Sequence, residues 1–178
     1  MSEIDKLIAY LKELDFKPKI SDFEDKLKIQ KTVCLLELMG VNLHYDFSMY
    51  VRGPYSHDLT KELYDNKEKV ENLQTTSSLN ATEKEAAEKI RETSDGLKPT
   101  LLEIMATYSF LTQKRNKNAK EAIIELKQLK PFFSETDVAV GVSRSKILFP
   151  PTQAEVENMK NEFRAWENAS DADALKQA

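Results

Sequence analysis

The sequence predicts a mainly α-helical protein: a compact multi-helix domain with a small β-strand or hairpin around residues 41–52. Three observations predict this fold class. Gly and Pro are scarce, at 4 and 6 of 178 residues, so the chain lacks the many turns that an all-β fold needs. Apolar residues recur at helical spacing over most of the chain. Between residues 41 and 51 that spacing changes to alternation, which is typical of a strand.

The first two helices follow from apolar stripes. Over residues 3–14 the stripe has i, i+3, i+4, i+7 spacing and consists of Ile4, Leu7, Ile8, Leu11 and Leu14. Ser21 or Asp22 is expected to cap the second helix. Its inner stripe is predicted to be Phe23, Leu27, Gln30, Cys34 and Leu38. Gly40 is expected to end this helix in the left-handed conformation.

The alternating segment is predicted to have two faces. The inner face is expected to contain Val41, Leu43, Tyr45, Phe47, Met49 and Val51. The outer face is expected to contain Asn42, His44, Asp46, Ser48, Tyr50 and Arg52. Gly53 and Pro54 then predict a turn. Ser56 is expected to cap the next helix, which carries Leu59 on its inner side.

The middle of the chain alternates polar stretches with helices. Residues 65–80 are polar and are expected to be mostly exposed linker. Thr82 and Glu85 are expected to form a capping box at the start of the next helix. Further helices are expected to begin near Pro99 and Ser134.

A last helix is predicted to begin at Thr152. Its apolar residues are Val156, Met159, Phe163 and Trp166. Residues 1–170 are predicted to form a single domain. Residues 171–178 have little to bury and are expected to be a frayed tail.

Composition and charge restrict the classes of partner and compartment. The formal net charge is −4 and the isoelectric point is about 5.4, which disfavours binding to phosphate backbones by the protein as a whole. No apolar run approaches the ~20 residues of a membrane-spanning helix. The acidic N-terminal segment does not resemble a signal peptide. We therefore expect a cytoplasmic protein without membrane contact.

The residue types that carry chemistry are few. Cys34, His44 and His57 offer at most three ligands, whereas a structural zinc site normally takes four. Cys34 lies on the apolar face of its helix, so we interpret it as a structural residue and not as a nucleophile. The chain has no Gly-rich phosphate loop and no hydrolase or metalloprotease motif. The sequence predicts no enzyme, no metal and no cofactor.

The turn at Gly53-Pro54 is the strongest candidate for a binding site. Alternation places Tyr50 and Arg52 on the exposed face, and Tyr and Arg often carry binding energy at interfaces. We predict a partner-binding surface made of Tyr50, Arg52, Tyr55 and His57. In the alternative interpretation the turn is only a corner, with both tyrosines packed inward and Arg52 paired with a nearby acid.

This region resembles the Panacea-domain family, which includes antitoxins of the SocA type and YwgA-like proteins. The resemblance begins at Ile29-Gln30-Lys31. It continues in a structural motif of Tyr45, Phe47, Gly53, Pro54, Ser56 and Leu59, together with Tyr50 and Tyr55. The resemblance covers about the first third of the chain. It implies an antitoxin or regulatory adaptor that binds a protein partner, such as a toxin, through one Panacea-like helical domain.

A second reading of the sequence is a winged-helix-like DNA-binding regulator. The order helix, helix, strand, turn and helix is compatible with such a unit. The basic residues that would face the DNA backbone are Lys26, Lys28, Lys31, Lys114, Arg115, Lys117 and Lys120. The acidic net charge argues against this reading, although a local basic patch would survive it. The sequence does not fix the oligomeric state.

Overall fold

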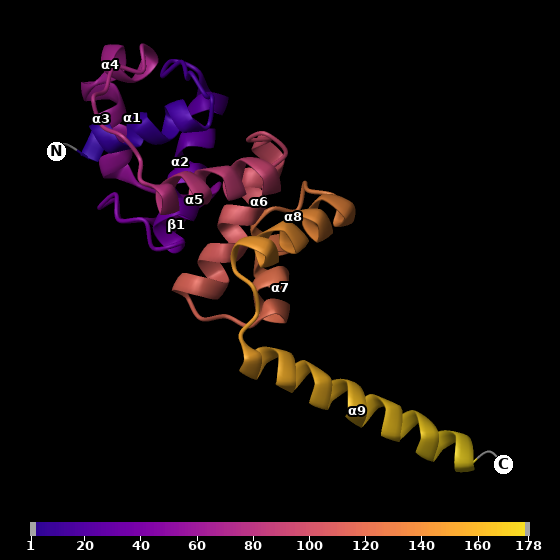
Figure 1. Ribbon diagram of the computed structural model, residues 1–178. Coiled ribbons are helices and arrows are strands. Elements are labelled where there is room, and N and C mark those ends of the chain that lie inside the picture. Colours follow the sequence, from indigo (N-terminus) through magenta and orange to yellow (C-terminus); the bar gives the residue numbers. More distant parts are fainter. Residues whose placement is uncertain (1–2, 177–178) are drawn as a thin grey trace.

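The computed structural model describes residues 3–176, and within them the chain is mainly helical (Figure 1). The helices are α1 (Glu3–Glu13), α2 (Phe23–Leu38), α3 (His57–Asp65), α4 (Lys67–Glu71), α5 (Ala81–Thr93), α6 (Pro99–Ser109), α7 (Ala119–Leu129), α8 (Glu135–Leu148) and α9 (Gln153–Lys176). A short π-helix, η1 (Phe110–Lys114), continues α6. The strands β1 (Ser48–Tyr50) and β2 (Gly53–Tyr55) form an antiparallel hairpin. The predicted fold class is confirmed.

Helix α6 is the centre of the fold. It packs against α2 on one side and α8 on another, and every residue from 101 to 111 is buried. A helix that is apolar nearly all round must be covered on several sides, which explains this central position. The main core lies between α1, α2, α5 and α6. A smaller core between α6, η1, α7 and α8 consists of Ile104, Tyr108, Leu111, Ala122, Leu126, Val138 and Val142.

The predicted helix ends are mostly confirmed. Asp22 caps α2, Ser56 caps α3 and Ser134 caps α8, each accepting a hydrogen bond from a backbone N–H. Gly40 has φ of 89°, as the left-handed helix end requires. The capping box predicted at residues 82–85 is wrong. Asn80 and Glu83 form it instead, two residues earlier.

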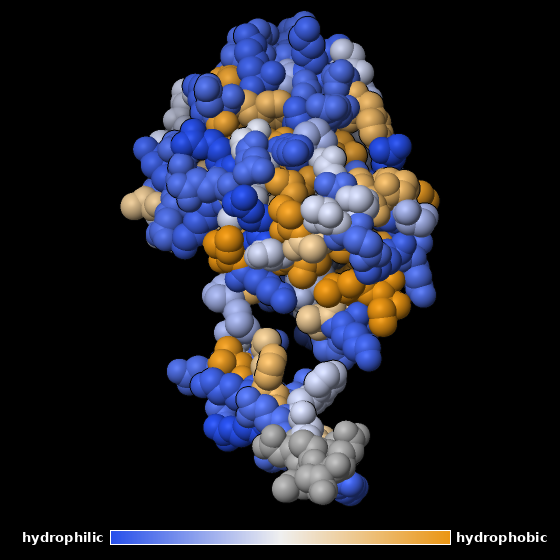
Figure 2. Space-filling view, turned by 90° about the vertical axis from the view of Figure 1, so that its right-hand side faces the viewer, coloured by the Kyte–Doolittle hydropathy of each residue, from blue (hydrophilic) through white to orange (hydrophobic). Residues whose placement is uncertain are grey.

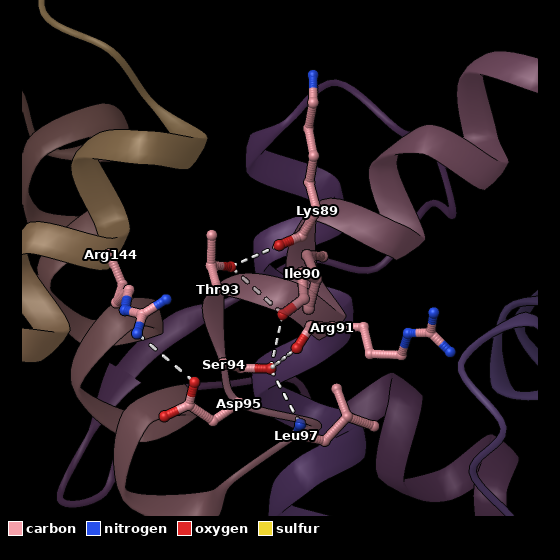
Figure 3. A network of polar contacts seen from close by, with 8 residues as sticks. All are labelled: Lys89, Ile90, Arg91, Thr93, Ser94, Asp95, Leu97 and Arg144. Atoms are coloured by element: carbon pink, nitrogen blue, oxygen red, sulfur yellow. Dashed lines mark hydrogen bonds and ion pairs between the residues drawn. The ribbon is translucent and has the colours of Figure 1, made fainter.

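The turn from α5 to α6 is held by side chains (Figure 3). Ser94 Oγ donates to the Ile90 carbonyl at 2.6 Å and accepts from the Leu97 N–H at 3.0 Å. Arg144 of α8 reaches Asp95 at 3.6 Å. The Ser94 hydrogen bonds satisfy backbone groups at the end of α5 and fix the direction in which the chain enters α6.

The prediction that Phe23 lies on an inner face is wrong, and the prediction of a mostly exposed linker over residues 65–80 is only partly right. Phe23 is 58% exposed because it occupies the first position of α2, beyond the neighbours that cover Leu27. The predicted linker over 65–80 contains α4, and its Val70 and Leu79 are buried in the core. The spacing of single apolar residues within a polar stretch did not indicate this burial.

Residues 41–47 keep the predicted alternation without being a strand. Leu43 and Tyr45 are buried, while His44 is exposed. The N–H groups of Leu43 and Tyr45 donate to Glu37 Oε1 at 3.1 and 3.0 Å. The Glu37 carboxylate therefore accepts the backbone hydrogen bonds that a neighbouring strand would otherwise accept. Burial raises the pKa of Glu37, and these backbone donors oppose that shift.

Helix α9 projects away from the other helices (Figures 1 and 2). Between residues 157 and 170 all of its side chains are exposed. Residues 171–176, predicted as a frayed tail, continue this helix, and residues 177–178 lie outside the described part of the chain. Among residues 3–176 no helix has both the length and the apolarity needed to cross a bilayer.

Candidate functional site

The hairpin β1–β2 lies directly on α6. Gly53 has φ of 87°, and a Cβ built on it would approach Thr107 Oγ1 of α6 to 2.3 Å. Both the backbone conformation and the space therefore require glycine at this position. Residues 51 and 52 form the turn between Tyr50 and Gly53, which are paired across the strands.

Helix α2 holds the hairpin through two buried side chains. The Gln30 amide donates to the Ser56 carbonyl at 2.8 Å and accepts from the Ser56 N–H at 2.9 Å. Lys31 Nζ donates to the Pro54 carbonyl at 2.7 Å. Gln30 also donates to Thr60 Oγ1 at 2.8 Å. The adjacent Gln and Lys thus fix the backbone that leads from the hairpin into α3.

Between α2, the hairpin and α3 lies a cavity of about 370 Å³. Its wall is mostly apolar, and all four residues of the predicted partner-binding surface line it. Those four residues are Tyr50, Arg52, Tyr55 and His57. The structure therefore brings together the side chains that the sequence singled out. Their role in binding stays a prediction.

Three aromatic rings in mutual contact form one side of this cavity. The rings of Tyr50, Tyr55 and His57 make edge-to-face contacts with centroids 5.0–5.5 Å apart. Tyr50 Oη lies 3.1 Å from His57 Nε2. The guanidinium of Arg52 stands over the Phe23 ring at 4.8 Å. The predicted corner, with Arg52 paired to an acid, is therefore not what the described residues form, because Arg52 stacks on an aromatic ring.

The charges that line the cavity are all positive. They belong to Lys26, Lys31 and Arg52, and no Asp or Glu side chain lines it. Among the side chains that the structure describes, no carboxylate lies within 4 Å of these three cations. Lys26 Nζ instead donates to Tyr64 Oη at 2.7 Å. Such a surface favours an anionic ligand.

Lys31 is the most perturbed of these cations. Burial lowers its pKa to about 8, and the nearby Lys130 and Arg52 charges act in the same direction. Cys34 and Glu103 oppose the shift. Lys31 is only 2% exposed, so its positive charge lies at the floor of the cavity. Lys26 and Arg52 are more exposed and lie at the rim.

Val51 and Phe23 join the cavity although the sequence placed both in the core. Val51 is 84% exposed because it occupies the hairpin turn, where the strand alternation ends. Phe23, Lys26 and Thr60 were missed as site residues. The first two lie on α2 at spacing i, i+3, so helical spacing alone would have placed them side by side. Their meeting with the hairpin depends on tertiary packing.

The other members of the structural motif anchor the hairpin to the core. Tyr45 is buried, and its hydroxyl donates to Glu62 Oε2 of α3 at 2.5 Å. Leu59 is fully buried, and Phe47 is half-buried against the same core. Together these side chains fix α3 next to the segment that precedes β1.

The Cys and His residues do not meet. Cys34 is 1% exposed, and burial raises its pKa to about 12. His44 is exposed, and His57 belongs to the aromatic cluster. No three His, Cys, Asp or Glu side chains among those the structure describes are arranged to hold a metal ion.

One of the basic residues of the DNA-binding hypothesis is inaccessible, and two others are paired with acids. Lys31 is buried under the hairpin and is not accessible to a nucleic-acid backbone. Lys28 pairs with Glu24 at 3.2 Å, and Lys117 pairs with Glu125 at 2.8 Å. The placement of Lys31 on a DNA-facing surface is therefore wrong.

Comparisons with models of known protein families, with curated proteins and with solved structures found no match to this chain. The resemblance to the Panacea-domain family stays a prediction.

Proposed function

We propose that the protein is a binding module, in the manner of an antitoxin or a regulatory adaptor, that captures a protein partner in the cavity between α2, the hairpin and α3. It acts by binding and not by catalysis. One observation carries the proposal: a mostly apolar cavity of about 370 Å³ whose only charged lining residues are Lys26, Lys31 and Arg52. We call this cavity the hairpin pocket.

The chemistry of the hairpin pocket defines the segment that it binds. Its aromatic wall matches a bulky apolar side chain, which would fill a desolvated site as hot-spot residues do. Its cationic rim matches carboxylates next to that side chain. We therefore propose a partner segment with an aromatic or large aliphatic anchor flanked by Asp or Glu.

The rigidity of the pocket supports a binding role. Gln30 and Lys31 fix the hairpin backbone, and Gly53 seats it on α6. A wall held in this way loses little conformational entropy when a ligand enters. Tyr50 and Val51 nevertheless remain exposed at its mouth, where they are accessible to a partner.

Selection from a displayed random-peptide library on the immobilised protein tests this function. Selected peptides should share an apolar anchor flanked by carboxylates. They should fail to bind the variant Tyr50→Ala with Arg52→Ala. The matched control is Arg144→Ala with Ile147→Ala, which removes a half-buried arginine, paired with Asp95 at 3.6 Å, and an exposed apolar side chain from α8, a helix that does not line the pocket.

The proposal fails if no peptide is enriched, or if the enriched peptides bind the Tyr50/Arg52 variant as well as they bind the wild type. Melting temperatures of both variants show whether any loss of binding reflects unfolding. Both should melt close to the wild type, because Tyr50, Arg52 and Ile147 are exposed and a half-exposed ion pair such as Arg144–Asp95 contributes little to stability.

A further inference from the structure

Helix α9 carries a mostly exposed apolar face. Its apolar residues at spacing 3, 4, 3 lie on one side of the helix. They are Val156, Met159, Phe163 and Trp166. Phe163 is 71% exposed and Trp166 is 81% exposed, and Figure 2 shows apolar surface along the projecting helix. Exposed apolar patches of this kind often mark sites of interaction with another protein.

The same helix is acidic. Over α9 six Asp or Glu residues stand against three Lys or Arg residues, so its formal charge is −3. Glu162 precedes Phe163, and Glu167 follows Trp166. The aromatic face therefore has carboxylates at both ends, although Arg164 lies between them.

Pairing of α9 with another α9 is disfavoured. The apolar spacing matches the a and d positions of a parallel coiled coil. In that register Glu155 would meet Lys160 of the second helix, but Glu162 would face Glu167. The apolar seam also ends after Trp166, and a seam of two heptads is short for a stable coiled coil.

The hairpin pocket has the complementary chemistry. Its aromatic wall would accept Phe163 or Trp166, and its Lys26 and Arg52 lack carboxylate partners among the side chains that the structure describes. We propose that α9 of one copy docks its Phe163–Trp166 face into the hairpin pocket of a second copy. This inference rests on the proposed function, because it gives the same pocket an occupant of the same chemistry.

If α9 of one copy docks on another copy, self-association and partner binding compete for the same hairpin pocket. A partner that binds the hairpin pocket must displace α9 of the second copy, so the free pocket becomes scarcer as protein concentration rises. Two copies that exchange their α9 helices reciprocally would close into a two-fold dimer.

Trp166 reports this docking directly, because it is the chain's only tryptophan. Its fluorescence is measured on the full chain over a wide range of protein concentration, together with mass by light scattering. We expect the emission to shift to shorter wavelength and the mass to rise above that of one chain as concentration increases. The variant Tyr50→Ala with Arg52→Ala should show neither change.

A mixing experiment distinguishes the possible occupants. The Tyr50/Arg52 variant keeps α9 intact, and the variant Phe163→Ala with Trp166→Ala keeps the pocket intact. Neither should associate alone. When they are mixed, the emission of the Tyr50/Arg52 variant should shift, because its Trp166 enters the intact pocket of the other chain. The Arg144→Ala, Ile147→Ala control should behave as the wild type does.

Four outcomes would overturn the inference. A shift that is independent of concentration would indicate docking within one chain, and association of the Tyr50/Arg52 variant alone would indicate α9–α9 pairing. Loss of association in the Arg144/Ile147 control would indicate docking on α8. The fourth outcome is that neither the emission nor the mass changes at any concentration. If peptides still bind the hairpin pocket in any of these cases, the proposed function stands and only the self-docking is wrong.

Discussion

Substitution of Gly53 by alanine tests whether the hairpin is seated on α6 as closely as the structure indicates. Two costs add. A residue with a Cβ held at φ of 87° costs about 1–2 kcal/mol. The new methyl group would also lie 2.3 Å from Thr107 Oγ1, and relief of such overpacking costs about 1–3 kcal/mol. We expect Gly53→Ala to lower the free energy of unfolding by about 3 kcal/mol.

The double variant Gly53→Ala with Thr107→Ala separates the two costs. Removal of Oγ1 leaves the residue 107 Cβ at 3.5 Å, which is ordinary contact. Thr107→Ala alone should cost about 1 kcal/mol, since it removes one buried methyl group and a hydroxyl bonded to the Glu103 carbonyl. Urea unfolding followed by circular dichroism gives all four values. The expected coupling is favourable by about 1–3 kcal/mol, and additive effects would refute the close approach of Gly53 to α6.

Three further predictions concern titration, reactivity and nucleic acid. Because the folded state holds the Lys31 pKa near 8, below the ordinary 10.5, the unfolded chain binds this proton more tightly. As the pH rises from about 8 to 10.5, the free energy of unfolding of the wild type should therefore increase by up to about 3 kcal/mol relative to that of Lys31→Met. If urea unfolding gives the same dependence of this free energy on pH for both proteins, the prediction is contradicted. The Cys34 thiol should react with Ellman's reagent at neutral pH only after unfolding, because its pKa is raised to about 12; rapid labelling of the native protein would contradict its burial. Fluorescence anisotropy at physiological salt should detect no nanomolar, sequence-dependent DNA binding, and such binding would favour the DNA-binding regulator instead.

The elements of the fold were predictable where local chemistry decides them. The stripe from Ile4 to Leu14 places α1 within a residue of its observed end, and Asp22 and Ser56 mark the starts of α2 and α3. Gly40 and Gly53 adopt the positive φ for which glycine is chosen. These features need only a few neighbouring residues, so the sequence contains the whole signal.

Features that depend on tertiary packing were not predictable from the sequence. Strand alternation placed Val51 inside, but the hairpin turn exposes it. The burial of Val70 and Leu79 within the polar stretch over 65–80 was not predicted, because the three apolar residues of that stretch do not recur at a regular interval. Tyr50 and Arg52 were found from alternation, whereas Phe23 was missed because it meets the hairpin only after α2 has packed against it.

The most direct test of the hairpin pocket as the binding surface is the affinity of one selected peptide, measured by calorimetry with matched variants. We expect the Tyr50→Ala, Arg52→Ala variant to bind at least about tenfold more weakly than the wild type while melting at nearly the same temperature. The Arg144→Ala, Ile147→Ala control should keep the wild-type affinity. Equal affinity of the pocket variant and the wild type would show that the partner binds elsewhere.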